Sequence, residues 1–298
     1  MSAIRLATGP VTWGVDFADA PGNPPWEHVL DEIAASDVGA LELGPVGYLP
    51  EDPAALRAAL DSRGLTAVGS FVFDDFHDPS RGAELVAATE RAARAIASAG
   101  GAVLLLIDRP SPERAATAGR SLDARRLDAR GWAAMLDAIR RAAAVAEDHG
   151  LRPAVHPHAG SYVEYEDEIE RLLDDSDLAL CLDTGHAAYA GIDADRALVA
   201  YGPRLAHVHL KDVRADVVER GLGFWAALAA GVFCPLGEGA VDLAAVLAAL
   251  DDIGYEGYAT IEQDRVPGSG SPLDDLAASV RVLSRAGVAD APSEARRR

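Results

Sequence analysis

Residues 178–210 read LALCLDTGHAAYAGIDADRALVAYGPRLAHVHL and contain two short apolar runs separated by an alanine-rich stretch. The runs are Leu178–Leu182 and Leu205–Leu210, and their composition is typical of strands that are buried on both faces of a parallel sheet. The stretch between them has a helical character and ends at Tyr201-Gly202, where glycine is typical of the position just past a helix. The segment therefore predicts a strand, a helix and a second strand parallel to the first.

The same pattern recurs along the chain. Six further apolar runs have a similar length and are separated by helical stretches: Ile4–Ala7, Ala40–Leu43, Thr66–Val72, Val103–Ile107, Arg152–His156 and Tyr258–Ile261. Eight strand–helix units are the number that closes into a (β/α)8 barrel, the TIM barrel. An open doubly wound sheet would carry a glycine cluster after its first strand, and Thr8-Gly9-Pro10 is no such cluster. We expect an α/β fold with one TIM-barrel domain over residues 1–288 and a disordered polar tail at 289–298.

The composition agrees with such a fold and argues against several other classes of protein. A chain of 298 residues suits a barrel of about 250 residues with long loops. Its net charge of −20 argues against nucleic acid, which binds to a basic protein face. The sequence has no apolar run of membrane-spanning length, no signal-peptide pattern and only two cysteines. These features predict a cytoplasmic protein that does not insert into membranes.

Two connections are longer than the others, and both follow predicted strands. Residues 109–130 contain six arginines and no clear helix before Trp132, whereas residues 212–240 contain a short helical piece around Phe224–Ala230. Active sites of TIM barrels lie at the carboxyl ends of the strands, so both loops should border the site as lids or substrate contacts. A solvated surface segment is the alternative for the arginine-rich loop.

Polar side chains end the last four predicted strands, at His156, Asp183, His209 and Glu262. The first two intervals are 27 and 26 residues, about one strand–helix unit, so these side chains should meet at one height. Two imidazoles and two carboxylates suit a divalent cation, with Mn²⁺ or Co²⁺ favoured and Zn²⁺, Fe²⁺ or Mg²⁺ as alternatives. Ca²⁺ fits badly because it prefers oxygen ligands. We interpret His207, on the strand of His209, as a hydrogen-bonded core histidine.

The motifs around these residues resemble the xylose isomerase-like superfamily of sugar isomerases and epimerases. The resemblance rests on LDTGH at 182–186 and HVHLKDVR at 207–214, and segments 10–14, 41–44, 156–160, 231–239 and 254–264 extend it. The segment GVFCPLGEG at 231–239 is similar to inosose (2-keto-myo-inositol) dehydratases. The resemblance implies metal ligands at Asp183, His209 and Glu262. Since the superfamily usually has Glu where this chain has His156, the fourth ligand is His156, His158 or a water.

The resemblance also implies a reaction, namely the dehydration of a cyclic polyol ketone through a metal-stabilised enolate. Sugar isomerisation or epimerisation is the alternative, because it begins with the same enolisation. His158 is the favoured base and Glu262 the other candidate, while Lys211 or Glu42 would protonate the departing hydroxyl. Lys211, the only lysine, would need a pKa lowered by the barrel interior for this role. Otherwise Lys211 forms an ion pair with a carboxylate, and Glu42 an ion pair with an arginine.

Four further residues are expected to contact the substrate: Trp13, His186, Asp212 and Gln263. Trp13 would form an apolar wall against the ring of a small polyol or sugar-like molecule. A non-catalytic binding barrel is a weaker alternative, because a scaffold would tolerate apolar residues at the strand ends. A DNA-repair endonuclease of the same superfamily would need a basic groove, which the net charge of −20 disfavours. Association into a homo-oligomer is open, since no interface stripe is recognisable.

Overall fold

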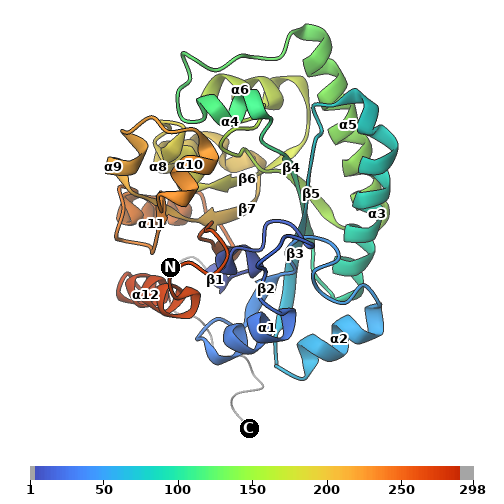
Figure 1. Ribbon diagram of the computed structural model, residues 1–298, viewed down its shortest axis with the longest axis vertical. Coiled ribbons are helices and arrows are strands. Elements are labelled where there is room, and N and C mark those ends of the chain that lie inside the picture. Colours follow the sequence, from blue (N-terminus) through green and yellow to red (C-terminus); the bar gives the residue numbers. More distant parts are fainter. Residues whose placement is uncertain (1–3, 289–298) are drawn as a thin grey trace.

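The computed structural model describes residues 4–288 and has the expected TIM-barrel fold (Figure 1). The eight parallel strands are β1 (Ile4–Ala7), β2 (Ala40–Glu42), β3 (Thr66–Asp74), β4 (Val103–Asp108), β5 (Arg152–Val155), β6 (Ala179–Asp183), β7 (Leu205–Leu210) and β10 (Gly257–Ile261). They pair in the order β1-β10-β7-β6-β5-β4-β3-β2, and a parallel bridge between Thr8 and Leu41 joins the two ends. All eight predicted strands are confirmed. The tail predicted at 289–298 lies outside the described residues.

Helices surround this barrel and cover the outer face of its strands (Figure 1). They are α1 (Trp26–Ala35), α2 (Pro53–Asp61), α3 (Gly82–Ser98), α5 (Ala129–Asp148), α6 (Glu166–Asp175), α8 (Ala194–Tyr201), α11 (Leu243–Asp252) and α12 (Pro272–Arg285). The main hydrophobic core lies between these helices and the strands, and a smaller cluster that includes Phe71, Leu105 and Cys181 fills the barrel interior. In the described part of the chain, no helix combines the length and the apolar character that a membrane crossing requires.

Tyr201 ends α8 as the sequence predicts, but Gly202 does not adopt the expected left-handed conformation. Its φ is −44°, because the chain continues directly into a 3-10 turn at Gly202–Arg204.

The loop at 109–130 differs from the expectation of a segment without helix. It contains α4 (Pro112–Thr117), and α5 already begins at Ala129. The guanidinium of Arg114 is fully buried and donates to both carboxylate oxygens of Glu168, at 2.6 and 3.0 Å, and to Glu164 at 3.3 Å. Because both glutamates lie near the start of α6, this ion pair fixes the loop to the neighbouring strand–helix connection.

The loop at 212–240 also contains more structure than its sequence predicts. The helix around Phe224–Ala230 is confirmed as α10 (Phe224–Ala229), and α9 (Ala215–Val218) precedes it. Two short strands that the sequence analysis missed, β8 (Asp212–Val213) and β9 (Phe233–Cys234), pair antiparallel. The hairpin holds α10 at the carboxyl end of the barrel, where the candidate site lies.

Candidate active site

Four side chains from consecutive late strands converge inside the carboxyl end of the barrel, as predicted. His156 follows β5, Asp183 ends β6, His209 lies on β7 and Glu262 follows β10. All four are buried, and the candidate ligand atoms of the four residues lie within 4.8 Å of one another. The arrangement therefore brings two imidazoles and two carboxylates to a single point.

The hydrogen bonds of the two histidines determine which ring nitrogen faces this point. His156 Nδ1 lies 2.7 Å from the carbonyl oxygen of Pro157, so Nδ1 carries the hydrogen and Nε2 presents its lone pair. His209 Nε2 lies 2.9 Å from the carboxylate of Glu42, so its lone pair is on Nδ1. His156 Nε2 and His209 Nδ1 lie 3.7 and 3.5 Å from the same atom, Asp183 Oδ2.

This geometry fits a bound divalent cation. His209 Nδ1 is buried and has no hydrogen-bond partner, which is costly unless another group satisfies it. Burial lowers the pKa of His209, but the neighbouring Cys181 and the carboxylates of Glu262 and Glu42 raise it well above its usual value. A mixed nitrogen and oxygen donor set of this kind is typical of Mn²⁺, Co²⁺, Fe²⁺ or Zn²⁺ sites.

Lys211 is fully buried beside this ligand set and is surrounded by carboxylates. Its Nζ lies 3.0 Å from Asp183, 2.7 Å from Glu262 and 2.8 Å from Asp264. Burial alone would lower the pKa of Lys211, but the carboxylates of Asp183, Asp264 and Glu262 raise it well above its usual value. The expectation that the pKa of Lys211 is lowered is therefore wrong. Lys211 instead forms ion pairs with carboxylates, which was the alternative.

Glu42 contacts the ligand set from the barrel interior and does not line the cleft. Its Oε1 lies within 3.0 Å of His207 Nε2, His209 Nε2 and Thr260 Oγ1. Burial would raise the pKa of Glu42, but His209 and His207 lower it well below its usual value, so the carboxylate is ionised. The partners of Glu42 are thus histidines, not the arginine considered as its alternative. The prediction that His207 is a hydrogen-bonded core histidine is confirmed.

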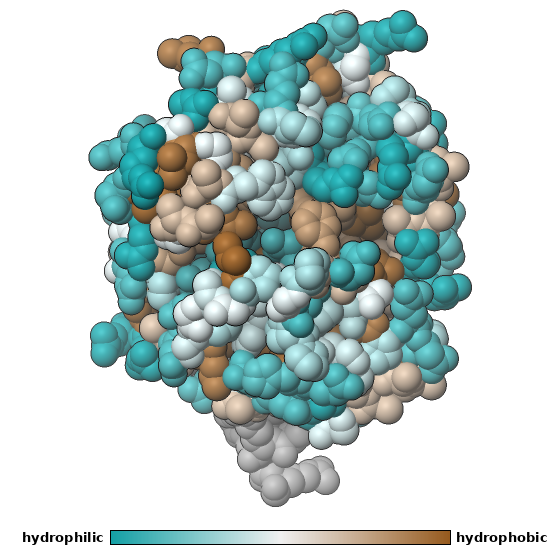
Figure 2. Space-filling view, viewed as in Figure 1, coloured by the Kyte–Doolittle hydropathy of each residue, from teal (hydrophilic) through white to brown (hydrophobic). Residues whose placement is uncertain are grey.

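A cleft opens next to the ligand set. Its polar lining consists of Asp16, His156, His158, Glu262 and Asp264, and its apolar lining of Val11, Phe71, Phe73, Ile107, Phe224 and Trp225. Figure 2 shows a hollow near the middle of this face, with hydrophobic side chains beside hydrophilic ones on its rim. Such a mixed lining suits a small ligand that has an apolar ring face and several polar substituents.

His158 is an imidazole that lines the cleft and is not one of the four candidate ligands. Its Nδ1 lies 2.9 Å from the carbonyl oxygen of Ala159 and therefore carries the hydrogen, which leaves the Nε2 lone pair free. Burial and the neighbouring imidazoles of His186 and His156 lower the pKa of His158 well below its usual value. A neutral imidazole with a free lone pair can accept a proton from a molecule in the cleft.

Asp16 is a cleft residue that the sequence analysis did not identify. Among the described residues, its carboxyl group has no hydrogen-bond or ion-pair partner. Burial and the carboxylates of Asp264 and Glu262 raise the pKa of Asp16 to about 8. Its only sequence signal is its place three residues after Trp13, in the connection that follows the first strand.

Two of the expected substrate contacts have structural roles instead. Trp13 is buried in the main core, where its Nε1 donates to Glu32 on α1 at 2.5 Å, so it is not a wall of the cleft. Asp212 is fully buried, and its carboxylate accepts the backbone N–H groups of Gly237, Gly239 and Val241. Asp212 thereby shapes the end of the 212–240 loop. It does not line the cleft, contrary to its expected contact with substrate.

The other two expected contacts, His186 and Gln263, lie behind the cleft lining. The ring of His186 packs on that of His158 with a centroid distance of 4.0 Å, and its Nε2 lies 3.3 Å from Asp264. Gln263 Nε2 donates to the carbonyl oxygen of Phe233 at 3.4 Å. Neither side chain lines the cleft. Asp264, which does, was not singled out from the sequence, although it follows Glu262 by two residues.

Comparison with known proteins agrees with this geometry. A family model described as xylose isomerase-like TIM barrel matches residues 30–286. The inosose dehydratase of Geobacillus kaustophilus is 31% identical over 287 residues, which cover 91% of each chain. The resemblance inferred from the sequence motifs is thus confirmed.

Solved structures of low sequence identity share the fold. The probable 3-DHS dehydratase AsbF of Bacillus anthracis superposes with a TM-score of 0.72 at 16% identity and covers 94% of this chain and 99% of its own. The IolI protein with a bound zinc atom superposes with a TM-score of 0.71 at 15% identity and covers 95% of this chain and 98% of its own.

Proposed function

This chain belongs to the xylose isomerase-like TIM barrel family and is an enzyme, and we propose that it dehydrates a cyclic polyol ketone of the inosose type. The observation that carries the proposal is the cleft, where a cation-binding set of four side chains lies beside a neutral imidazole and an unpartnered carboxyl group. The inosose dehydratase that is 31% identical supports the choice of substrate class.

In this proposal the chain depends on a divalent cation held by His156, Asp183, His209 and Glu262. Mn²⁺ and Co²⁺ are favoured, with Zn²⁺, Fe²⁺ and Mg²⁺ as alternatives. When bound, such a cation supplies a Lewis acid that stabilises negative charge developing on a ketone oxygen. His209 Nδ1, which is buried and has no hydrogen-bond partner, supports a cation at this place.

His158 is the proposed base. Its Nε2 takes the proton from the ring carbon beside the ketone, and the electron pair of the broken C–H bond moves toward the carbonyl group. A neutral imidazole suits this role, and the phenyl rings of Phe73 and Phe224, with centroids 5.3 Å from that of His158, limit access of water. Glu262, the other candidate base, is already ion-paired with Lys211.

Asp16 is the proposed acid. The C–O bond of the β-hydroxyl breaks as the carboxylic proton of Asp16 is transferred to the departing oxygen, which leaves as water. The other product is an unsaturated ketone that carries an enol hydroxyl on the former α-carbon, and tautomerisation of this enol gives the dione. A pKa of about 8 keeps this carboxyl protonated at neutral pH. Asp16 replaces the two acids suggested by the sequence, because Lys211 is locked among three carboxylates and Glu42 is ionised below His209.

The test is to incubate the Mn²⁺- or Co²⁺-loaded protein with 2-keto-myo-inositol and identify the product by NMR. A dehydrated dione is the expected product, and the H209A variant, which lacks one proposed ligand, should form none. An epimer would instead assign the chain to the isomerase and epimerase alternative. An unchanged substrate would contradict the proposal. The expected cytoplasmic location and self-association stay predictions.

A further inference from the structure

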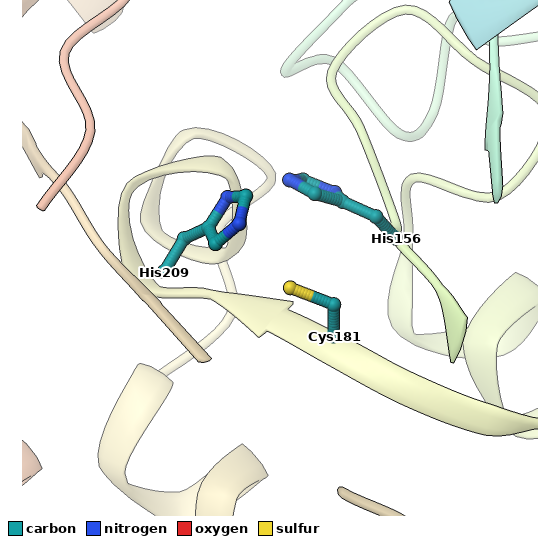
Figure 3. Close-up of side chains that lie close together, drawn as sticks. All are labelled: His156, Cys181 and His209. Atoms are coloured by element: carbon teal, nitrogen blue, oxygen red, sulfur yellow. The ribbon is translucent and has the colours of Figure 1, made fainter. Parts of the chain in front are cut away.

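The barrel interior contains a thiol group that the proposed reaction does not use. Cys181 lies on β6, two residues before Asp183, and alternation along the strand places both side chains on the inner face. Figure 3 shows the sulfur of Cys181 pointing toward the space between the rings of His156 and His209. Candidate ligand atoms of these three residues lie within 4.8 Å of one another, and all three side chains are buried.

We propose that His156, Cys181 and His209 form a second, deeper position for a thiophilic divalent cation such as Zn²⁺ or Cd²⁺. His209 Nδ1, the ring nitrogen that both positions would use, is buried and has no hydrogen-bond partner. Since Nδ1 of His156 and Nε2 of His209 are already engaged by Pro157 and Glu42, each ring offers a single lone pair. The deep position and the outer position with Asp183 and Glu262 therefore share both histidines and exclude each other.

The chemistry of the ligands separates the cations that would choose each position. Thiolate and imidazole are preferred by Zn²⁺ and Cd²⁺, whereas carboxylate oxygens suit Mn²⁺ and Mg²⁺. Cys181 also packs in an apolar cluster that includes Phe71, Leu105 and Ile107.

Lys211 favours the deep position for a second reason. Its ammonium group already neutralises Asp183 and Glu262, at 3.0 and 2.7 Å. A cation in the outer position shares these two carboxylates with the ammonium and is repelled by it. A cation bound to Cys181 leaves both ion pairs of Lys211 intact.

The deep position has a consequence for activity, and this part rests on the proposed function. Glu262 lines the cleft, whereas Cys181 does not. A cation at Cys181 would occupy both histidines, so that they could not bind a cation in the outer position with Asp183 and Glu262. Zn²⁺ or Cd²⁺ should therefore displace Mn²⁺ and inhibit turnover. The inhibition should be weaker in the C181S variant.

The deciding experiment is a Cd²⁺ titration of the whole protein, followed by near-ultraviolet absorbance and by metal analysis. Wild-type protein should bind one Cd²⁺ per chain and develop the thiolate-to-metal charge-transfer band. The C181S variant should lose this band and bind Cd²⁺ more weakly. C234S is the matched control, because Cys234 is the other buried thiol and lies on β9, so C234S should behave as wild type. Circular dichroism confirms that each variant is folded, and C181A repeats the test if C181S is not.

Three results would overturn the inference. Stoichiometric Cd²⁺ without a charge-transfer band would show that the cation binds without the sulfur of Cys181, and the proposed function would then stand unaffected. A band that persists in C181S would assign the sulfur ligand to another residue. Failure of the wild-type protein to bind Cd²⁺, Zn²⁺ or Mn²⁺ at all would overturn the deep position together with the metal-dependent function.

Discussion

Nε2 of His209 lies 2.9 Å from Oε1 of Glu42, across the barrel interior and 167 residues away in the sequence. The carboxylate accepts the ring hydrogen and thus directs the lone pair on Nδ1 of His209 toward Asp183 and Glu262. A carboxylate behind a metal-binding histidine fixes its tautomer and makes the ring a stronger ligand. Glu42, considered from the sequence as a proton donor, is therefore a positioning residue for the ligand set.

The E42Q variant tests this relationship. The amide removes the negative charge but keeps the size of the side chain, so His209 becomes a weaker ligand. We expect the affinity for Mn²⁺ to fall by roughly 10- to 100-fold, measured by isothermal titration calorimetry. E256Q, which changes an exposed glutamate, is the control and should bind Mn²⁺ as wild type does. An unchanged affinity in folded E42Q would contradict the role.

Gly185 provides a test of how closely Lys211 packs against α7 (Thr184–Tyr189). A Cβ at position 185 would lie 2.5 Å from Cγ and 2.8 Å from Cβ of Lys211, which is too close for any real contact. We expect G185A to lower the free energy of unfolding by about 1 to 3 kcal/mol, measured by urea denaturation. The matched control is G82A at the start of α3, where the new Cβ meets Arg141 at an ordinary 3.4 Å. Equal stability of the two variants would contradict this packing.

The strands and the ligand set could be predicted from the sequence because both depend on regular features. Buried parallel strands are short apolar runs, and their carboxyl ends meet at one edge, so Asp183 and His209 were placed together without a structure. Tertiary partners could not be predicted in this way. Nothing in the spacing indicates that Lys211 lies among three carboxylates.

Loop side chains were the least predictable part of the site. Trp13 and Asp16 lie three residues apart in an irregular segment, where no strand or helix period determines which side chain faces the cleft. The structure turns Trp13 toward α1 and Asp16 into the cleft. Cys181, by contrast, could have been found, since it shares an inner strand face with Asp183.

The R114M variant tests whether the arginine-rich loop is fixed by its buried ion pair. The change removes the buried counter-charge of Glu164 and leaves Glu168 with only the partly exposed Arg126 at 3.3 Å, a loss that costs about 3 to 5 kcal/mol of unfolding free energy. Urea denaturation measures the loss, and faster proteolysis within 109–130 should accompany it. R125M is the control, because the side chain of Arg125 is 76% exposed. The role would be contradicted if R114M were as stable as R125M.

His77 gives a prediction for the pH dependence of stability. Burial alone would lower the pKa of His77, but its hydrogen bond to Asp108, at 2.7 Å, raises it above 6.5. A histidine with a raised pKa in the folded state stabilises the fold below its unfolded pKa, and this contribution is lost as pH rises through the folded pKa. The stability difference between wild type and H77Q should therefore be larger at about pH 5.5 than at about pH 8.5, by roughly 1 kcal/mol.

Thermal or urea unfolding at the two pH values measures this difference, and NMR titration of the His77 ring locates its pKa directly. Introducing D108N should remove the pH dependence, since the partner charge is then absent. If wild type and H77Q differed in stability by the same amount at both pH values, Asp108 would not stabilise the protonated ring of His77.

Asp16 carries the last prediction, because it is the residue on which the proposed proton transfer to the departing hydroxyl depends. The D16N variant keeps the shape of the side chain and can still hydrogen-bond to a substrate, but it cannot donate a carboxylic proton. We expect kcat for dehydration of 2-keto-myo-inositol to fall by roughly 10²- to 10⁴-fold, with a smaller change in KM. Metal content should be unchanged, because Asp16 is not one of the proposed ligands.

The pH profile separates an acid from a residue that only binds substrate. An acid must be protonated to act, so wild-type activity should be present below the pKa of about 8 and fall as pH rises through it. This alkaline limb should be absent from the residual activity of D16N. D19N, which alters an exposed neighbour, is the control and should keep both the rate and the profile of wild type. If D16N retained the wild-type rate or the alkaline limb, the proton would have to come from another group, and the assignment of Asp16 would be wrong.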